Sequence, residues 1–179
     1  MYVPIRLERC AAAAFAALAL TGCATLTVRS YSGPGDNVTQ YRTYDWGPAD
    51  AVSTGDPRLD NNPFFHDRVQ ADVESQLATR GFEKTPPGTP DLLLRYHASL
   101  EQRVAVPAVD NENANCRGCR PAIYDAGTLT LDFTDSRTGR LVWRGWAEGA
   151  MDGVIDNQDW MEQQIDEAVI RILARLPRR

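Results

Sequence analysis

Two cysteines separated by two residues, Cys116 and Cys119, are the side chains in this sequence best suited to chemistry. Such a pair can act as a redox centre when a helix N-terminus stabilises the first thiolate. It can also supply half of a tetrahedral zinc site, for which only His66 and His97 could provide further histidine ligands. The simplest interpretation is a local disulfide, which would stabilise the loop by at most about 2 kcal/mol. We expect this disulfide and no metal site, with redox thiols, zinc or idle thiols as the alternatives.

His97 is a second residue that could take part in catalysis, because Glu101 lies four residues further along the chain. In a strand both side chains would point to the same face, where a carboxylate beside an imidazole could form a general base. A solvated strand position explains the same histidine without catalysis. The sequence contains no GxSxG, HExxH or P-loop motif. We therefore expect no catalytic residue, no cofactor and no enzymatic activity.

The two cysteines and His97 lie in or beside segments with the alternating pattern of β-strands. Apolar and polar residues alternate in residues 91–101 and 128–135. Residues 136–140 have the composition of a hairpin turn, after which residues 141–149 are expected to pair with the strand before the turn. The cysteine pair falls in a polar, irregular segment from about Arg103 to Ile123. The expected inward-facing residues are Leu92, Leu94, Tyr96, Ala98, Leu100, Leu129, Leu131 and Phe133.

Two segments have the period of amphipathic helices and carry helix-end signals. The first begins with an Asn62 cap and Pro63 at the first helical position, and Gly81 closes it. The second begins at Asn157 and ends at Pro177. The expected buried stripes are Phe65, Val69, Val73 and Leu77 in the first helix, and Met161, Ile165, Ala168, Val169, Ile172 and Leu176 in the second.

Two further strands are expected near the N-terminus, at residues 24–31 and 41–46. The order is then strand, strand, helix, three strands and helix. Because one face of this sheet is polar, the helices are expected to cover only the apolar face. The sequence thus predicts an α+β fold, a two-layer sandwich in which a mostly antiparallel sheet of four to five strands carries two helices on one face.

The polar face of this sheet carries the residues best suited to binding a partner. Arg95 and His97 lie on it, and Trp146 shares it with Arg144. Trp143 has the opposite parity and is expected in the core. An exposed tryptophan beside arginine is typical of a protein-binding hot spot. We therefore expect Arg95, His97, Arg144 and Trp146 to contribute to a surface for a protein partner.

Residues 1–22 have the features of a secretory signal peptide that is removed from the mature protein. Their uncharged apolar run, Cys10 to Leu20, is too short to span a membrane, which requires about 20 apolar residues. The LTGC sequence that ends at Cys23 resembles the lipobox of bacterial lipoproteins, in which the cysteine is acylated and becomes the N-terminus. This resemblance implies a membrane anchor through lipid on Cys23, and Ala24 after the cysteine favours the outer membrane.

The 157 residues that remain have the length of one domain. Residues 23–40 would hold the lipidated N-terminus, the first strand and a loop, and residues 41–177 a single α+β domain. The signal peptide carries two arginines and one glutamate, so its removal changes the formal net charge from −5 to −6. Because nucleic-acid binding requires clustered lysine and arginine, this acidic chain is not expected to bind nucleic acid.

Several segments of the mature chain together resemble the bacterial lipoproteins grouped as domain of unknown function 4136. They are YRTYDW, RGF after the first helix, PDLLLRYH, the long segment YDAGTLTLDFTDSRTGRLVWRGWAEG, and the LP that ends the final helix. The resemblance spans nearly the whole mature chain and implies a periplasm-facing α+β domain on a lipid tether. It implies no activity. Cys116 and Cys119 are not part of the family pattern and are a local elaboration of it.

These features favour a non-catalytic outer-membrane lipoprotein with its domain in the periplasm. Its lipid would bind the membrane, and its polar sheet face would bind an envelope protein during envelope assembly or maintenance. The alternative is a lipoprotein that binds a small molecule or a lipid in a pocket between the helices and the sheet. That alternative requires a core that its own side chains do not fill.

Overall fold

The structure is a computed structural model, and it describes residues 26–47, 54, 56–85, 89–105 and 122–178. Cys23, Cys116 and Cys119 lie outside these residues, so the lipidation and the disulfide stay predictions. Within the described ranges, no helix is both long enough and apolar enough to cross a membrane.

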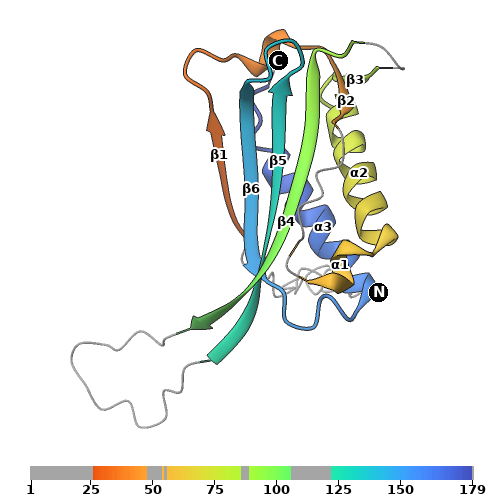
Figure 1. The fold of residues 1–179 in the computed structure, drawn as a ribbon, viewed down its shortest axis with the longest axis vertical. Coiled ribbons are helices and arrows are strands. Elements are labelled where there is room, and N and C mark those ends of the chain that lie inside the picture. Colours follow the sequence, from red (N-terminus) through yellow and green to blue (C-terminus); the bar gives the residue numbers. More distant parts are fainter. Residues whose placement is uncertain (1–25, 48–53, 55, 86–88, 106–121, 179) are drawn as a thin grey trace, which may run out of the picture.

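One six-stranded sheet forms the first layer of the fold (Figure 1). Its strand order is β1-β6-β5-β4-β2-β3. The strands β1, β6, β5 and β4 pair antiparallel in that order, whereas β2 pairs parallel with both β4 and β3. The strands are β1 (Thr27–Ser32), β2 (Thr43–Trp46), β3 (Glu83–Lys84), β4 (Leu92–Ala105), β5 (Ala122–Asp135) and β6 (Leu141–Ala150).

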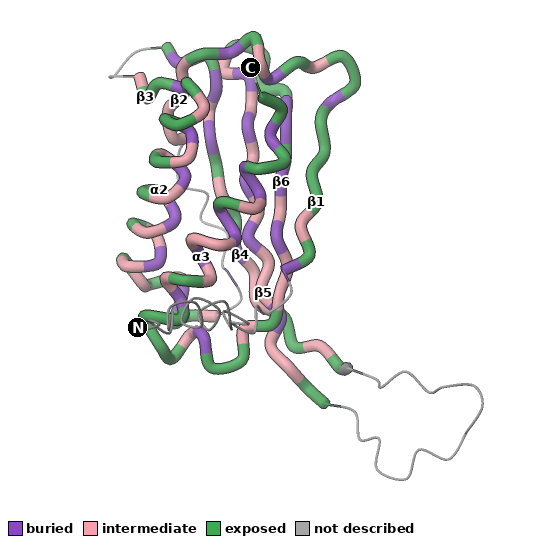
Figure 2. Tube along the Cα trace, turned by 180° about the vertical axis from the view of Figure 1, so that it is seen from behind, coloured by how far each residue is buried: buried purple, intermediate pink, exposed green. Residues whose placement is uncertain are grey.

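Two long helices form the second layer and cover one face of the sheet (Figure 1, Figure 2). Both begin where the sequence predicts, because an asparagine side chain caps each of them. Asn62 accepts a hydrogen bond from the N–H of Phe65, and Asn157 accepts one from the N–H of Trp160. The helices are α1 (Pro57–Asp60), α2 (Pro63–Ala78) and α3 (Gln158–Leu173), and a 3-10 turn, η1 (Val38–Gln40), precedes β2.

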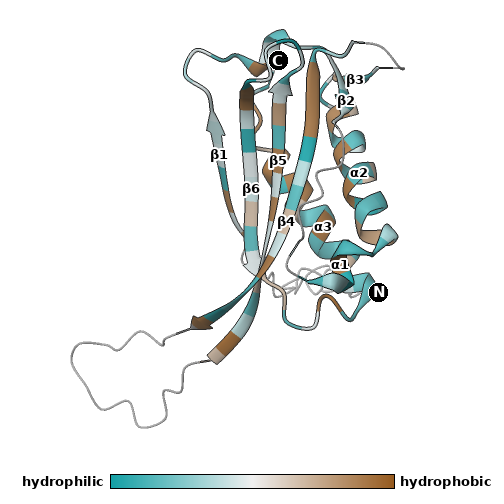
Figure 3. Cartoon of the chain, in the orientation of Figure 1, coloured by the Kyte–Doolittle hydropathy of each residue, from teal (hydrophilic) through white to brown (hydrophobic). Residues whose placement is uncertain are grey.

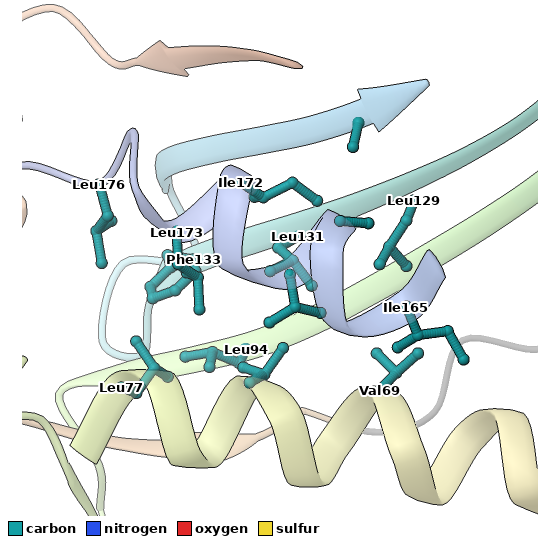
Figure 4. Close-up of a cluster of buried hydrophobic side chains, with 14 of the residues drawn as sticks. Val69, Leu77, Leu94, Leu129, Leu131, Phe133, Ile165, Ile172, Leu173 and Leu176 are labelled. Atoms are coloured by element: carbon teal, nitrogen blue, oxygen red, sulfur yellow. The ribbon is translucent and has the colours of Figure 1, made fainter. Parts of the chain in front are cut away.

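The hydrophobic core lies between α2, α3 and the inward face of the sheet (Figure 4). Every residue predicted for the two helical stripes is buried. The predicted inward residues of β4 and β5 are also buried, except that Tyr96 and Leu100 are half-buried against the same core. Trp143 is fully buried, as its parity predicts, and its ring meets that of Phe133 edge to face at a centroid distance of 5.0 Å.

The sheet differs from the prediction in its strand number. It has six strands rather than four to five, because the two-residue β3 is too short to leave a periodic pattern. Three of its five strand pairings are antiparallel, as predicted for most of the sheet, but the sheet is mixed. The strand β2 pairs parallel with β4, because α2 connects the two as a crossover and the chain returns in the same direction. The four-residue helix α1 was also not predicted, since it is too short to show a helical period.

The strands β4 and β5 extend beyond their predicted ends into the segment interpreted as irregular. Residues 101–105 pair with residues 122–126, and the two strands leave the body of the sheet as a twisted ribbon (Figure 1). Val104 and Ile123 are cross-strand partners near the outer end of this ribbon, and both ends are coloured as hydrophobic in Figure 3. Their exposed fractions are 57% and 69%, so the ribbon presents an apolar pair to solvent.

Candidate binding sites on the sheet face and beneath the helices

The polar face of the sheet brings together the four residues predicted to bind a partner. Arg95 and His97 lie on β4, Arg144 and Trp146 lie on β6, and β5 runs between them. Both long helices pack on the opposite face, so the polar face carries no helix in the part of the chain that the structure describes (Figure 1). The four residues therefore share one face, as the alternation predicts.

Trp146 lies at the centre of a row of side chains that crosses four strands. Its cross-strand neighbours are Arg29 on β1 and Thr130 on β5, and His97 on β4 follows Thr130. Trp146 is half-buried rather than fully exposed, because on an inner strand its ring lies between neighbouring side chains. The row thus combines a half-buried tryptophan with an exposed arginine and an exposed histidine.

A second row, one pleat away, carries the charges of this face. Arg144 donates two hydrogen bonds to Asp132, from Nε to Oδ1 at 2.6 Å and from Nη2 to Oδ2 at 2.5 Å. These bonds raise the pKa of the Arg144 guanidinium and hold it in one orientation. Tyr31 and Arg95 occupy the two ends of the row, and the Arg95 side chain lies close against Gly47.

The two histidines lie on opposite faces of the sheet. His97 is exposed on the polar face, where Glu101 forms an ion pair of 3.7 Å with Arg103. His66 lies on α2, and its Nδ1 forms a hydrogen bond with the hydroxyl of Tyr96 on the apolar face. The sheet therefore separates the two histidines that could have completed a zinc site. Among the described residues, no group of three or more His, Cys, Asp or Glu side chains could hold a metal ion.

An apolar pocket lies between α3 and the end of the sheet where β1 begins and β6 ends, and its volume is about 60 Å³. The helices contribute Phe65 and Ile165 to its lining, the sheet contributes Ala98 and Leu129, and Leu26 lines it just before β1. Ligand binding between the helices and the sheet requires such a space, but the sequence does not locate it, because the space depends on how several elements pack together.

Small residues on the inward face of the sheet create this pocket. Gly127 and Gly149 are cross-strand partners, and a Cβ on either would collide with a side chain that lies directly over it. A Cβ on Gly127 would lie 2.6 Å from Cγ of Met151, and a Cβ on Gly149 would lie 2.5 Å from Cδ2 of Leu26. The sequence signal for the pocket is therefore a set of small residues at inward positions of adjacent strands, namely Ala98, Gly127, Ala147 and Gly149.

Gln164 on α3 adds a polar group to this apolar lining. Its Oε1 is buried and accepts no hydrogen bond from any residue that the structure describes. The same burial keeps this oxygen from reaching a ligand in the pocket, and the other side chains of the lining are almost all apolar. The pocket therefore suits an alkyl chain.

A family model assigns the chain on the basis of its sequence. The model described as Domain of unknown function (DUF4136) matches residues 28–178. The chain belongs to this family. The match confirms the resemblance seen in the sequence, and the DUF4136 domain includes the polar face, both long helices and all of the pocket lining except Leu26.

Solved structures resemble this DUF4136 domain at low sequence identity, and the first described here shares its fold. A PDZ domain protein from Parabacteroides distasonis matches with a TM-score of 0.54 and 12% identity, over 85% of this chain and 36% of that one. The chain thus spans about a third of that protein. Two crystal forms of the PelC dodecamer from Paraburkholderia phytofirmans match with TM-scores of 0.49 and 0.46 at 15% and 13% identity, each over 87% of this chain and 99% of that one. No curated protein matches the chain.

Proposed function

We propose that this DUF4136 domain is the periplasmic part of an outer-membrane lipoprotein, which binds an envelope protein on its polar sheet face and catalyses no reaction. The LTGC sequence at Cys23 supports the lipid anchor. The observation that carries the binding role is the grouping of Arg95, His97, Arg144 and Trp146 on the face opposite the helices.

The rigidity of this surface favours the binding of a folded partner. Its residues lie on neighbouring strands of one sheet, so little backbone conformational entropy is lost when a partner covers them. Trp146 supplies the aromatic anchor, and Asp132 holds the Arg144 guanidinium beside it in a fixed orientation. Aromatic and arginine side chains in this arrangement account for most of the binding energy in many protein interfaces.

Site-specific photo-cross-linking in intact envelopes tests this proposal. A photoreactive amino acid at position 97 should yield one discrete cross-linked product, and the same group at the exposed position 75 on α2 should not. Trp146→Ala should lower the yield on the order of tenfold or more, while the thermal midpoint of unfolding changes little. The matched control is Trp160→Ala, because Trp160 is 53% exposed at the start of α3 and lies on the helical layer. Equal products from both positions, or an equal effect of both substitutions, would contradict the binding face.

A second candidate function is the binding of a small molecule or lipid, and the apolar pocket favours it. An unlipidated secreted form should then gain thermal stability when dodecanoate is added below its micellar concentration. The gain should be lost in Ala98→Val, which fills the pocket from β4, and kept in Ala150→Val, which lies on β6 outside the pocket. Unchanged stability of the original protein at all concentrations would exclude this fatty acid as a ligand.

A further inference from the structure

We propose that the apolar pocket receives an acyl chain that is attached to Cys23 of the same molecule. This inference rests on the proposed lipidation and names the occupant of the pocket. Three features of the structure carry it: the position of Leu26, the chemistry of the lining, and two flexible side chains that lie over the cross-strand glycines.

Leu26 places the predicted lipid site beside the pocket. Its side chain lines the pocket, and its carbonyl oxygen accepts a hydrogen bond of 2.7 Å from Nη2 of Arg171 on α3. Glu167, one turn earlier, pairs with Arg171 at 2.9 Å and helps to hold it. Cys23 is only three residues from this fixed point, so its Cα can lie at most roughly 11 Å from the Cα of Leu26. An acyl chain on Cys23 therefore starts within reach of the pocket.

The lining of the pocket suits such a chain. Apolar side chains from both layers bind methylene groups, and burial stabilises each methylene by about 0.8 kcal/mol. The lining offers an acyl chain contacts along its length, because side chains from the helices, the sheet and Leu26 all take part in it.

Two side chains decide how much of an acyl chain the pocket can hold. The volume of about 60 Å³ is less than half of the roughly 150 Å³ of an apolar cavity that holds one benzene molecule. Met151 lies over Gly127 and Leu26 lies over Gly149, so rotation of these side chains would extend the pocket along the two glycines. Methionine is suited to this movement, because three rotatable bonds let it fill or leave an irregular space.

The tether favours the protein's own lipid over a lipid from the bilayer. A group held by a short flexible linker has an effective concentration in the millimolar range at a site within its reach. A free lipid must in addition lose translational and rotational freedom on binding. We therefore infer that binding is intramolecular, and that the lipid of Cys23 exchanges between the pocket and the membrane.

Hydrogen exchange followed by mass spectrometry tests the inference on the mature lipidated protein in lipid nanodiscs. The reference is a Cys23→Ser variant secreted with a non-lipoprotein signal peptide and mixed with vesicles of the same lipids. Amides in residues 161–168 of α3 should exchange on the order of tenfold more slowly in the lipidated protein. Lipidated Ala98→Val should lose this protection, whereas lipidated Ala150→Val should keep it. Because both variants sit on the same membrane, the comparison separates filling of the pocket from shielding by the bilayer.

Three other outcomes would contradict the inference, and each points to a different cause. An intact mass without acyl chains on Cys23 would overturn both the proposed anchor and the inference. Acylated protein with unchanged exchange would overturn the inference alone. Equal protection of the Cys23→Ser variant by vesicles would assign the pocket to a bilayer lipid instead. If Ala98→Val does not fold, as judged by circular dichroism, Ala147→Val fills the pocket from β6 and replaces it in the same comparison.

Discussion

The phenolic hydroxyl of Tyr41 donates a hydrogen bond of 2.9 Å to Oδ2 of Asp135. Asp135 ends β5, and its other oxygen accepts hydrogen bonds from the backbone N–H groups of Arg137 and Thr138 in the hairpin turn. The Thr138 N–H, followed by the Tyr41 hydroxyl, lowers the pKa of Asp135 to about 2. One buried carboxylate thereby joins the turn between β5 and β6 to the segment before β2.

Acid is expected to destabilise the domain partly through Asp135. Its pKa of about 2 in the folded protein lies below the roughly 3.9 of an unfolded aspartate. The stabilisation is therefore present above about pH 4 and is lost as the pH falls toward 2. Asp135→Asn should flatten the fall of the free energy of unfolding over this interval, as measured by urea denaturation. The same slope in both proteins would contradict the role of Asp135.

The parts of the fold that follow from local sequence signals were predicted correctly. Helix α2 combines an asparagine cap, a proline at the first position and apolar residues at four-residue spacing, and each of these acts within a few residues. The ribbon end of β4 has no such local signal. Residues 102–105 are extended because they pair with residues 122–125, which are distant in sequence. The parallel pairing of β2 with β4 is also a product of tertiary packing rather than of local pattern.

The two candidate binding sites also differ in how far local sequence signals predict them. Strand alternation alone places Arg95 and Trp146 on one face, because every second side chain points in the same direction. The pocket requires the relative position of α3, three strands and Leu26, which no periodicity contains. The clearest sequence feature of the pocket is its two glycines, Gly127 and Gly149, but the register that pairs them becomes known only from the folded sheet.

Gly145 is expected to be required by the ring of Trp143. A Cβ at this position would lie 2.7 Å from Cγ2 of Ile172 and would also collide with the Trp143 ring. Gly145→Ala should therefore lower the free energy of unfolding by about 1–3 kcal/mol, which urea denaturation can measure. Trp143→Phe shortens the ring, so adding Gly145→Ala to that variant should cost much less. Strictly additive losses would mean that Ile172, rather than the Trp143 ring, opposes a side chain at position 145.

The cap of α3 gives a prediction with a matched pair of variants. Asn157→Ala removes the oxygen that accepts a 3.0 Å hydrogen bond from the N–H of Trp160, and it should cost about 1 kcal/mol of stability. Asn157→Asp keeps an acceptor at the same position and adds a charge that the helix N-terminus favours. The aspartate variant should therefore unfold at nearly the original urea concentration. Equal destabilisation by both substitutions would show that the capping oxygen is not what stabilises this helix end.

The apolar pair at the end of the ribbon should contribute little to the stability of the isolated domain. Val104 and Ile123 are 57% and 69% exposed, so replacing both by threonine should change the free energy of unfolding by less than about 0.5 kcal/mol. Val142 on β6 is 1% exposed, and Val142→Thr should cost about 1–3 kcal/mol because it buries a hydroxyl. The free energies of unfolding of the two variants can be compared by urea denaturation at low protein concentration. A loss in the ribbon variant as large as that in Val142→Thr would mean that the ribbon end is covered in solution, and light scattering would then show whether a second copy of the chain covers it.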